Sequence, residues 1–288
     1  MPESVAELIG LLDLTQTEEA VFVGHDGDPQ GRLIQRVFGG QVLAQALIAA
    51  YRTVAEDRLA HSLGAHFLRA GRVGVPISYA VELTRDGGSF STRRVVASQD
   101  GREIFSMIGS FHVPETGLNH ADLPPGQVPP PQECPPLAEV LGARSQRETE
   151  AWRREWGVLD VRFASDTSAL SARGRSDADM KVWVRAGSEL PADERLHQAV
   201  LAYASDLTLL AVSTVPHPVD FAGPAMQVAS IDHSMWFHRP ARADQWTLYD
   251  QVSPSASAGL GFSFGRMFSG DTLVASCAQE GLIRMIRP

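Results

Sequence analysis

Two stretches of the chain decide its fold: VLAQALIAA at residues 42–50 and VLAYASDL at residues 200–207. Both begin Val-Leu-Ala-x-Ala, at an offset of 158 residues, and both have the length and composition of an apolar helix. A helix that is apolar all the way round must be buried all the way round. We therefore expect each stretch to be a central helix that the rest of its half of the chain encloses.

Segments with the alternating pattern of strands follow each of these helices. The expected strands are 77–83, 90–97 and 104–111 in the first half, and 246–252, 261–268 and 273–283 in the second. An offset of 170 residues pairs Tyr79 with Tyr249 and superposes the hairpin turns Asp100-Gly101 and Gly270-Asp271. A strongly curved antiparallel sheet wrapped round an apolar helix is the hotdog arrangement. The sequence thus predicts an α+β protein made of two fused hotdog units.

Prolines divide the two units. Eight of the 18 prolines lie between Pro114 and Pro136, a density that no regular helix or central strand tolerates. We predict an N-terminal hotdog over residues 1–113, and a proline-rich linker with a surface helix (137–156) over residues 114–156. A C-terminal hotdog would then occupy residues 157–288.

Composition narrows the classes of function. Hydrophobic residues make up 44% of the 288, which excludes disorder, and the net charge of −9 argues against nucleic-acid binding. Lys181 is the only lysine, so no P-loop lysine exists. Cys134 and Cys277, the only cysteines, exclude a disulfide framework and a cysteine zinc site. Neither a basic signal segment nor a long apolar run is present, so we predict a cytoplasmic protein with no membrane insertion, no cofactor and no metal.

Three polar residues break the repeat. At these positions the second half has a polar side chain where the first half has an apolar residue or glycine. The pairs are Asp206 with Ile48, Ser230 with Ala60, and Gln279 with Gly109. Three such differences together indicate that one half kept a site which the other lost.

Each of these residues also has a structural interpretation. Asp206 would cap a helix break or bind nearby backbone amides. Ser230 would end a strand, and Gln279 would lie at a solvated edge. Strand geometry predicts Ser230, Asp232 and Ser234 on one face and His233 on the other, so the consecutive letters Asp-His-Ser cannot form a triad.

Several blocks around these residues resemble one family, acyl-CoA thioesterase II of the TesB type with its peroxisomal relatives. The blocks are Gly39-Gly40-Gln41, HFLR at 66–69, RDGGSFSTRRV at 85–95, YASDL at 203–207, IDHSMWFHRP at 231–240 and Gln279-Glu280-Gly281. The resemblance covers about residues 5–284 and is poor over 137–179. It implies a double hotdog that hydrolyses fatty acyl-CoA to free acid and CoA. It also implies a site formed by Asp206, Ser230 and Gln279, with serine where the bacterial archetype has threonine.

The implied chemistry is hydrolysis without a covalent intermediate. We expect Asp206 to act as general base on a water that attacks the thioester carbonyl, with Ser230 and Gln279 orienting that water and Asp206. Backbone amides at a helix N-terminus would stabilise the oxyanion. The phosphates of CoA require a local basic patch, for which the substrate-binding candidates are Arg93, Arg94, Arg239, Arg69, Arg266 and, beside Ala60, His61.

Two alternatives remain open from the sequence. A MaoC-like enoyl-CoA hydratase has a histidine five residues after its aspartate, but here that residue is Ala211 and the next histidine is His217. A non-catalytic acyl-CoA-binding protein would explain the fold but not the retained polar set. Because hotdog sheets have exposed edges, we also expect a homo-oligomer.

Overall fold

The computed structural model describes residues 2–25, 36–142, 146–164, 177–221, 223 and 225–286. Within these ranges thirteen strands form one antiparallel sheet, in the order β1-β2-β4-β5-β6-β3-β10-β13-β12-β11-β8-β7, with β9 paired to β13. The strands are β1 (Thr15–Glu18), β2 (Val21–Gly24), β3 (Leu59–Phe67), β4 (Ile77–Asp86), β5 (Phe90–Gln99), β6 (Arg102–His112), β7 (Leu159–Phe163), β8 (Asp179–Ala186), β9 (Met226–Ser230), β10 (Asp232–Phe237), β11 (Thr247–Ser257), β12 (Leu260–Ser269) and β13 (Thr272–Met285). The helices are α1 (Val5–Leu12), α2 (Gly39–Tyr51), η1 (Pro131–Glu133), α3 (Leu137–Leu141), α4 (Gln146–Trp156), α5 (Glu194–Ser205) and η3 (Leu209–Thr214).

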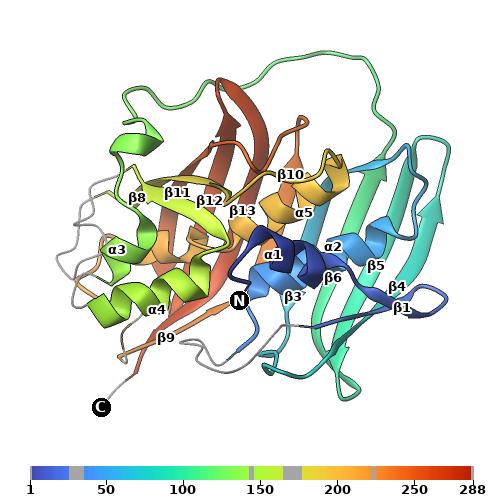
Figure 1. Cartoon of the computed structure of the whole chain (residues 1–288), viewed down its shortest axis with the longest axis horizontal. Coiled ribbons are helices and arrows are strands. Elements are labelled where there is room, and N and C mark those ends of the chain that lie inside the picture. Colours follow the sequence, from blue (N-terminus) through green and yellow to red (C-terminus); the bar gives the residue numbers. More distant parts are fainter. Residues whose placement is uncertain are drawn as a thin grey trace.

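The two central helices are α2 and α5, and they lie together against the curved sheet (Figure 1). Almost every residue of both helices is buried. The matching tyrosines fix them: the Tyr79 hydroxyl donates to Gln45 Oε1 (2.6 Å), and the Tyr249 hydroxyl donates to the Ser205 carbonyl (3.0 Å). The double hotdog predicted from the repeat is thereby confirmed.

The two half-sheets join where β3 pairs with β10. The helices run antiparallel, because Gly40 at the start of α2 lies against Tyr203 near the end of α5, and Tyr51 at the end of α2 meets Gln198 near the start of α5. Each end of the helix pair therefore brings together residues from both hotdogs.

A β-bulge interrupts the same place in both halves. In the second half Ser230 pairs with Gly281 and Ser234 with Ala278, so Ile231 is an extra residue between β9 and β10. In the first half the register of β3 against β6 shifts in the same way at His61. An extra residue reverses which face the following side chains occupy. The prediction that His233 faces away from Ser230 is therefore wrong, because it assumed an unbroken strand.

The proline-rich segment crosses between the hotdogs as an extended strap from β6 to η1 (Figure 1). Arg239 donates to Asn119 Oδ1 (2.7 Å) and to the His120 carbonyl (2.8 Å), and Trp183 Nε1 donates to the Pro129 carbonyl (2.8 Å). These contacts fix an otherwise irregular segment. We retain the division at 113/114 and 156/157 as a proposal, since β6 ends at His112 and α4 ends at Trp156.

The single helix predicted over 137–156 is instead two helices, α3 and α4. Gly142 is the C-cap of α3, and its backbone N–H donates the last hydrogen bond of that helix to the Ala138 carbonyl (2.9 Å). Residues 143–145 lie outside the described residues. The end of α4 does reach the core side, because Trp156 packs edge-on against Phe38 at 5.1 Å. Across the described ranges, no helix is long and apolar enough to cross a bilayer.

Candidate active site

Asp206 lies at the C-cap of α5, where the helix ends before the turn into η3. Its side chain is buried, at 8% exposure, and it points at the first turn of α2 from the other hotdog. The backbone N–H of Gly40 donates to the carboxylate. The prediction that Asp206 lies at a helix break is confirmed, since it is the C-cap of α5. Its carboxylate, however, accepts its backbone hydrogen bond from the neighbouring helix α2. A helix N-terminus stabilises a negative charge of this kind.

The Gly39-Gly40 pair permits this approach. A Cβ built on Gly39 would lie 2.5 Å from Asp206 Oδ2, and one built on Gly40 would lie 2.3 Å from the Tyr203 carbonyl oxygen. A side chain at Gly40 would press on the backbone of α5, and one at Gly39 would displace the Asp206 carboxylate and the Phe67 ring. The glycines therefore determine how closely the aspartate can approach the start of α2.

The three residues that broke the repeat come together in space. Ser230 Oγ donates to Asp206 Oδ1 (3.0 Å), and Gln279 Nε2 donates to the same oxygen (2.7 Å) and to Ser230 Oγ (2.7 Å). Gln279 is fully buried in β13, and Ser230 at the end of β9 is partly exposed. The geometry leaves Oδ2 of Asp206 facing Gly39, away from these two donors.

Burial dominates the electrostatics of Asp206. Loss of solvent raises the pKa of its carboxyl above the ordinary value of an aspartate. The hydrogen bonds that the carboxylate accepts from Ser230, Gln279 and the Gly40 amide lower that pKa in part. A carboxylate with a raised pKa is a stronger base, and the hydrogen bonds donated to it favour its ionised form.

His233 is the residue that the sequence reasoning missed. Because of the bulge at Ile231, its ring points inward, where Nδ1 lies 3.1 Å from Gln279 Oε1 and Nε2 lies 2.8 Å from Ser205 Oγ. The ring is fully buried, and this burial lowers the pKa of His233. The signal was in the repeat: the equivalent position in the first half is the apolar Leu63.

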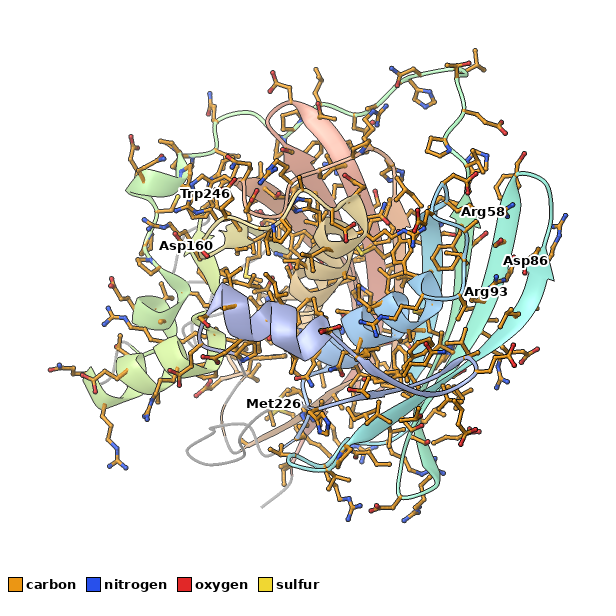
Figure 2. The ribbon with its side chains drawn as sticks, turned by 45° about the vertical axis from the view of Figure 1, so that its right-hand side comes forward. Arg58, Asp86, Arg93, Asp160, Met226 and Trp246 are labelled. Carbon is orange, nitrogen blue, oxygen red and sulfur yellow. The ribbon has the colours of Figure 1, made fainter. Side chains whose placement is uncertain are left out.

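The arginine candidates for CoA binding are placed differently from one another. Arg93 is 1% exposed, and its guanidinium is held by Asp86 Oδ1 (2.8 Å) and by the Thr53 carbonyl (2.8 Å). Figure 2 shows Arg93 and Asp86 beside Arg58 at the outer part of the first hotdog. Arg93 therefore braces that hairpin, and its burial argues against the contact with substrate phosphate that the sequence suggested.

The other candidates lie on the surface and already have partners. Arg94 pairs with Glu82 at 3.4 Å, and Arg239 donates to the proline-rich strap.

His61 and the last two arginine candidates also have protein partners. His61 is the extra residue of the first bulge, and its Nε2 lies 2.8 Å from Ser110 Oγ. Arg69 donates to the Glu103 carbonyl, and Arg266 pairs with Asp122 and Asp250. None of these contacts includes Asp206, Ser230 or Gln279.

Arg36 is a second residue that the sequence reasoning missed. It is exposed, it lies three residues before α2, and its Nη1 donates to the Val228 carbonyl (2.9 Å), two residues from Ser230. Among the described residues, no group of three or more His, Cys, Asp or Glu side chains is arranged to hold a metal ion. The polar site around Asp206 is thus a carboxylate with hydroxyl, amide and imidazole neighbours.

The chain is similar to known proteins over almost its whole length. A family described as "Acyl-CoA thioesterase" matches residues 155–282, and "Acyl-CoA thioesterase N-terminal domain" matches residues 29–112. The chain is 36% identical to Acyl-CoA thioesterase 2 of Haemophilus influenzae, over 99% of both chains. It is 37% identical to human Acyl-coenzyme A thioesterase 8, over 96% of this chain and 88% of the human one. The crystal structure of acyl-CoA thioesterase II TesB2 from Mycobacterium marinum superposes with a TM-score of 0.79 at 41% identity, covering 96% of this chain and 97% of that one.

The fold and these similarities define a thioester hydrolase of the double-hotdog class. The chain belongs to the acyl-CoA thioesterase family, within it to the thioesterase II (TesB) type, as the sequence blocks predicted.

Proposed function

We propose that this protein hydrolyses fatty acyl-CoA with Asp206 as the general base. The observation that carries the proposal is the single buried network in which Ser230 and Gln279 both donate to Asp206 Oδ1. These two bonds hold the carboxylate in one orientation and leave Oδ2 to accept a proton from a water. General-base assistance of this kind is typically worth about 10²–10⁴-fold in rate.

The start of α2 supplies the electrophilic part of the mechanism. In its first turn, the Gly40 amide donates to Asp206, and the amides of Gln41 and Val42 reach the Phe38 carbonyl. We assign the oxyanion contact to the amide of Gly39, the first residue of the helix, whose N–H has no acceptor within α2. Water attack, proton transfer to Asp206 and departure of the CoA thiol then occur at one helix N-terminus.

Hydration of an enoyl-CoA fits the geometry less well. A histidine does lie near Asp206, which the sequence did not foresee, but His233 is fully buried and both of its ring nitrogens have protein partners. Neither ring nitrogen of His233 is therefore placed to donate a proton to a substrate. A pure binding protein would have no use for a buried carboxylate whose pKa is raised.

For the phosphates of CoA we propose Arg36. Its exposed guanidinium bridges the residues before α2 and strand β9, which ends at Ser230. An arginine next to the reacting groups can hold a phosphate with several N–H donors at once. This position replaces Arg93, whose donors are already taken within the protein.

The test is Asp206→Asn, which preserves the size of the side chain and removes the base. Release of free thiol from a panel of acyl-CoA chain lengths should fall by about 10²-fold or more, in line with loss of a general base. A melting temperature near that of the wild type would show that the variant folds. Hydrolysis within a few-fold of the wild type would contradict the proposal, and enoyl-CoA hydration without thiol release would favour the hydratase.

A further inference from the structure

We propose that His233 is a positioning residue whose Nδ1–H fixes the Gln279 side-chain amide in the one orientation that serves Asp206. This inference rests on the proposed function, because it assigns a role within the same site. His233 does not touch Asp206 or Ser230 in the hydrogen-bond network; it acts through Gln279.

The argument begins with the ionised carboxylate, which can only accept hydrogen bonds. Gln279 must therefore present its NH₂ group to Asp206 Oδ1, and the same nitrogen donates to Ser230 Oγ. The amide oxygen Oε1 then points the other way, toward His233 Nδ1 at 3.1 Å. An amide oxygen also only accepts, so the proton between these two atoms belongs to Nδ1.

The other side of the ring completes the assignment. Burial keeps the ring neutral by lowering the pKa of His233, although the charges of Asp206 and Asp232 oppose this. A neutral ring with its proton on Nδ1 has an accepting Nε2, which lies 2.8 Å from Ser205 Oγ. The Ser205 hydroxyl is within hydrogen-bond distance of this nitrogen and of the Ala202 carbonyl (2.9 Å), and in the Nδ1 tautomer it turns its one proton toward the nitrogen. The tautomer of His233 is thus set from the side of Gln279, whose amide is oriented by Asp206, and Ser205 is compatible with it.

The first hotdog provides an internal comparison. Its equivalents of Asp206, Ser230, His233 and Gln279 are Ile48, Ala60, Leu63 and Gly109. Leu63 is buried on the same kind of strand after the same bulge, so this position in the fold accepts an apolar side chain. The second hotdog has the histidine and the other three polar residues, and the first hotdog has none of the four. A purely structural role for His233 does not explain why the four residues occur together.

Three substitutions of His233 separate positioning from packing. His233→Asn keeps an N–H near the Nδ1 position, His233→Gln places its amide near Nε2, and His233→Leu copies the first hotdog and removes both groups. We expect His233→Asn to retain kcat within about five-fold, and the other two to lose roughly 10- to 100-fold in kcat, with little change in KM. Displacement of a catalytic group by about 1 Å can cost on this scale.

The matched control is His238→Asn. His238 lies just beyond β10, is exposed and bonds Ser276 Oγ at 2.9 Å, at the far end of the strand from Ser230. This variant should keep the wild-type kcat and KM. Melting temperatures of all four variants show whether a loss of kcat follows loss of stability.

A measurement that needs no activity distinguishes failure of this inference from failure of the proposed function. Nitrogen NMR of the wild-type imidazole should show a neutral ring with the proton on Nδ1 of His233. A ring protonated on Nε2 alone would overturn the inference. The inference would also be overturned if the Asn, Gln and Leu variants lost kcat to the same extent, or if each loss of kcat simply followed the drop in melting temperature. If Asp206→Asn keeps activity while the Nδ1 tautomer is found, the proposed base fails and the orientation of Gln279 stands.

Discussion

The two ends of the α2–α5 helix pair are related by the internal repeat, yet only one of them carries the polar residues that we propose as the active site. At one end Asp206 of α5 meets the Gly39-Gly40 start of α2. At the other end Tyr51 of α2 meets the start of α5, where its hydroxyl donates to Gln198 Oε1 and accepts from the Ala60 amide (2.7 Å). Gln198 Nε2 also donates to the Ala60 carbonyl (3.1 Å).

The second end is therefore filled. The Tyr51 ring packs against Phe111 at 5.1 Å, and the Arg195 guanidinium lies 4.9 Å from the centre of the Tyr51 ring. Burial raises the pKa of the Tyr51 hydroxyl above its ordinary value, so it stays protonated at neutral pH and its role is structural. A duplicated fold can thus keep a polar cluster at one end of its helix pair and pack an aromatic side chain into the other end for stability.

The largest effect on the active end should come from Gly39→Ala. The new Cβ would lie 2.5 Å from Asp206 Oδ2 and 2.9 Å from the Phe67 ring, so the carboxylate must move away from the helix N-terminus. We expect kcat to fall by about 10²-fold or more, because misplacement by about 1 Å is enough for such a loss. Gly88→Ala is the control, since nothing lies within 4 Å of its Cβ position. Wild-type kcat in Gly39→Ala would mean that the closeness of the two helix ends is irrelevant to catalysis.

Ser230→Ala should have a smaller effect on kcat and a distinct effect on its pH dependence. Asp206 works as a base only when ionised, so activity falls as the pH drops through its raised pKa. The hydrogen bond from Ser230 lowers that pKa, and its removal raises it further. We expect about a ten-fold loss of kcat and an acid limb displaced to higher pH, measured as kcat from pH 4 to 9. An acid limb that stays in place or moves to lower pH would contradict the role of this hydroxyl.

The three residues of the proposed site could be located from the sequence because of the internal repeat. Asp206, Ser230 and Gln279 each replace a non-polar residue at the equivalent position of the other half, and such a difference is visible without a structure. The curved sheet and the central helices were predictable in the same way, because apolar periodicity is a local property of the chain.

What the sequence could not supply depends on long-range packing. The bulge at Ile231 reverses the facing of His233, and no local pattern marks it. The burial of Arg93 depends on how the hairpin folds back onto Thr53. The break after α3, in contrast, had a signal in Gly142, a residue type that commonly follows the end of a helix.

The filled end should respond in stability and not in catalysis. Tyr51→Phe keeps the ring but removes the hydroxyl that serves the Ala60 amide and Gln198. A buried polar group left without a partner costs about 1–3 kcal/mol, so the free energy of unfolding should fall by that amount in denaturant titration. The kcat of the folded variant should match that of the wild type. If kcat of the folded variant fell while the free energy of unfolding stayed near that of the wild type, the two ends of the helix pair would be coupled. The division into a catalytic end and a structural end would then be wrong.

The smallest effect concerns the arginine beside each helix start. At the filled end Arg195 donates to the carbonyls of Tyr51 (3.2 Å) and Ala55 (2.6 Å), whereas Arg36 at the active end remains exposed. Arg36→Gln should raise KM for acyl-CoA a few-fold with kcat unchanged, because it removes a contact made equally in the ground and transition states. The exposed Arg72→Gln is the control for loss of surface charge. The KM effect should shrink as salt is added, since an exposed charge contact is screened. An unchanged KM at low salt would show that the CoA phosphates bind elsewhere, and that the asymmetry between the two arginines reflects only how each end is packed.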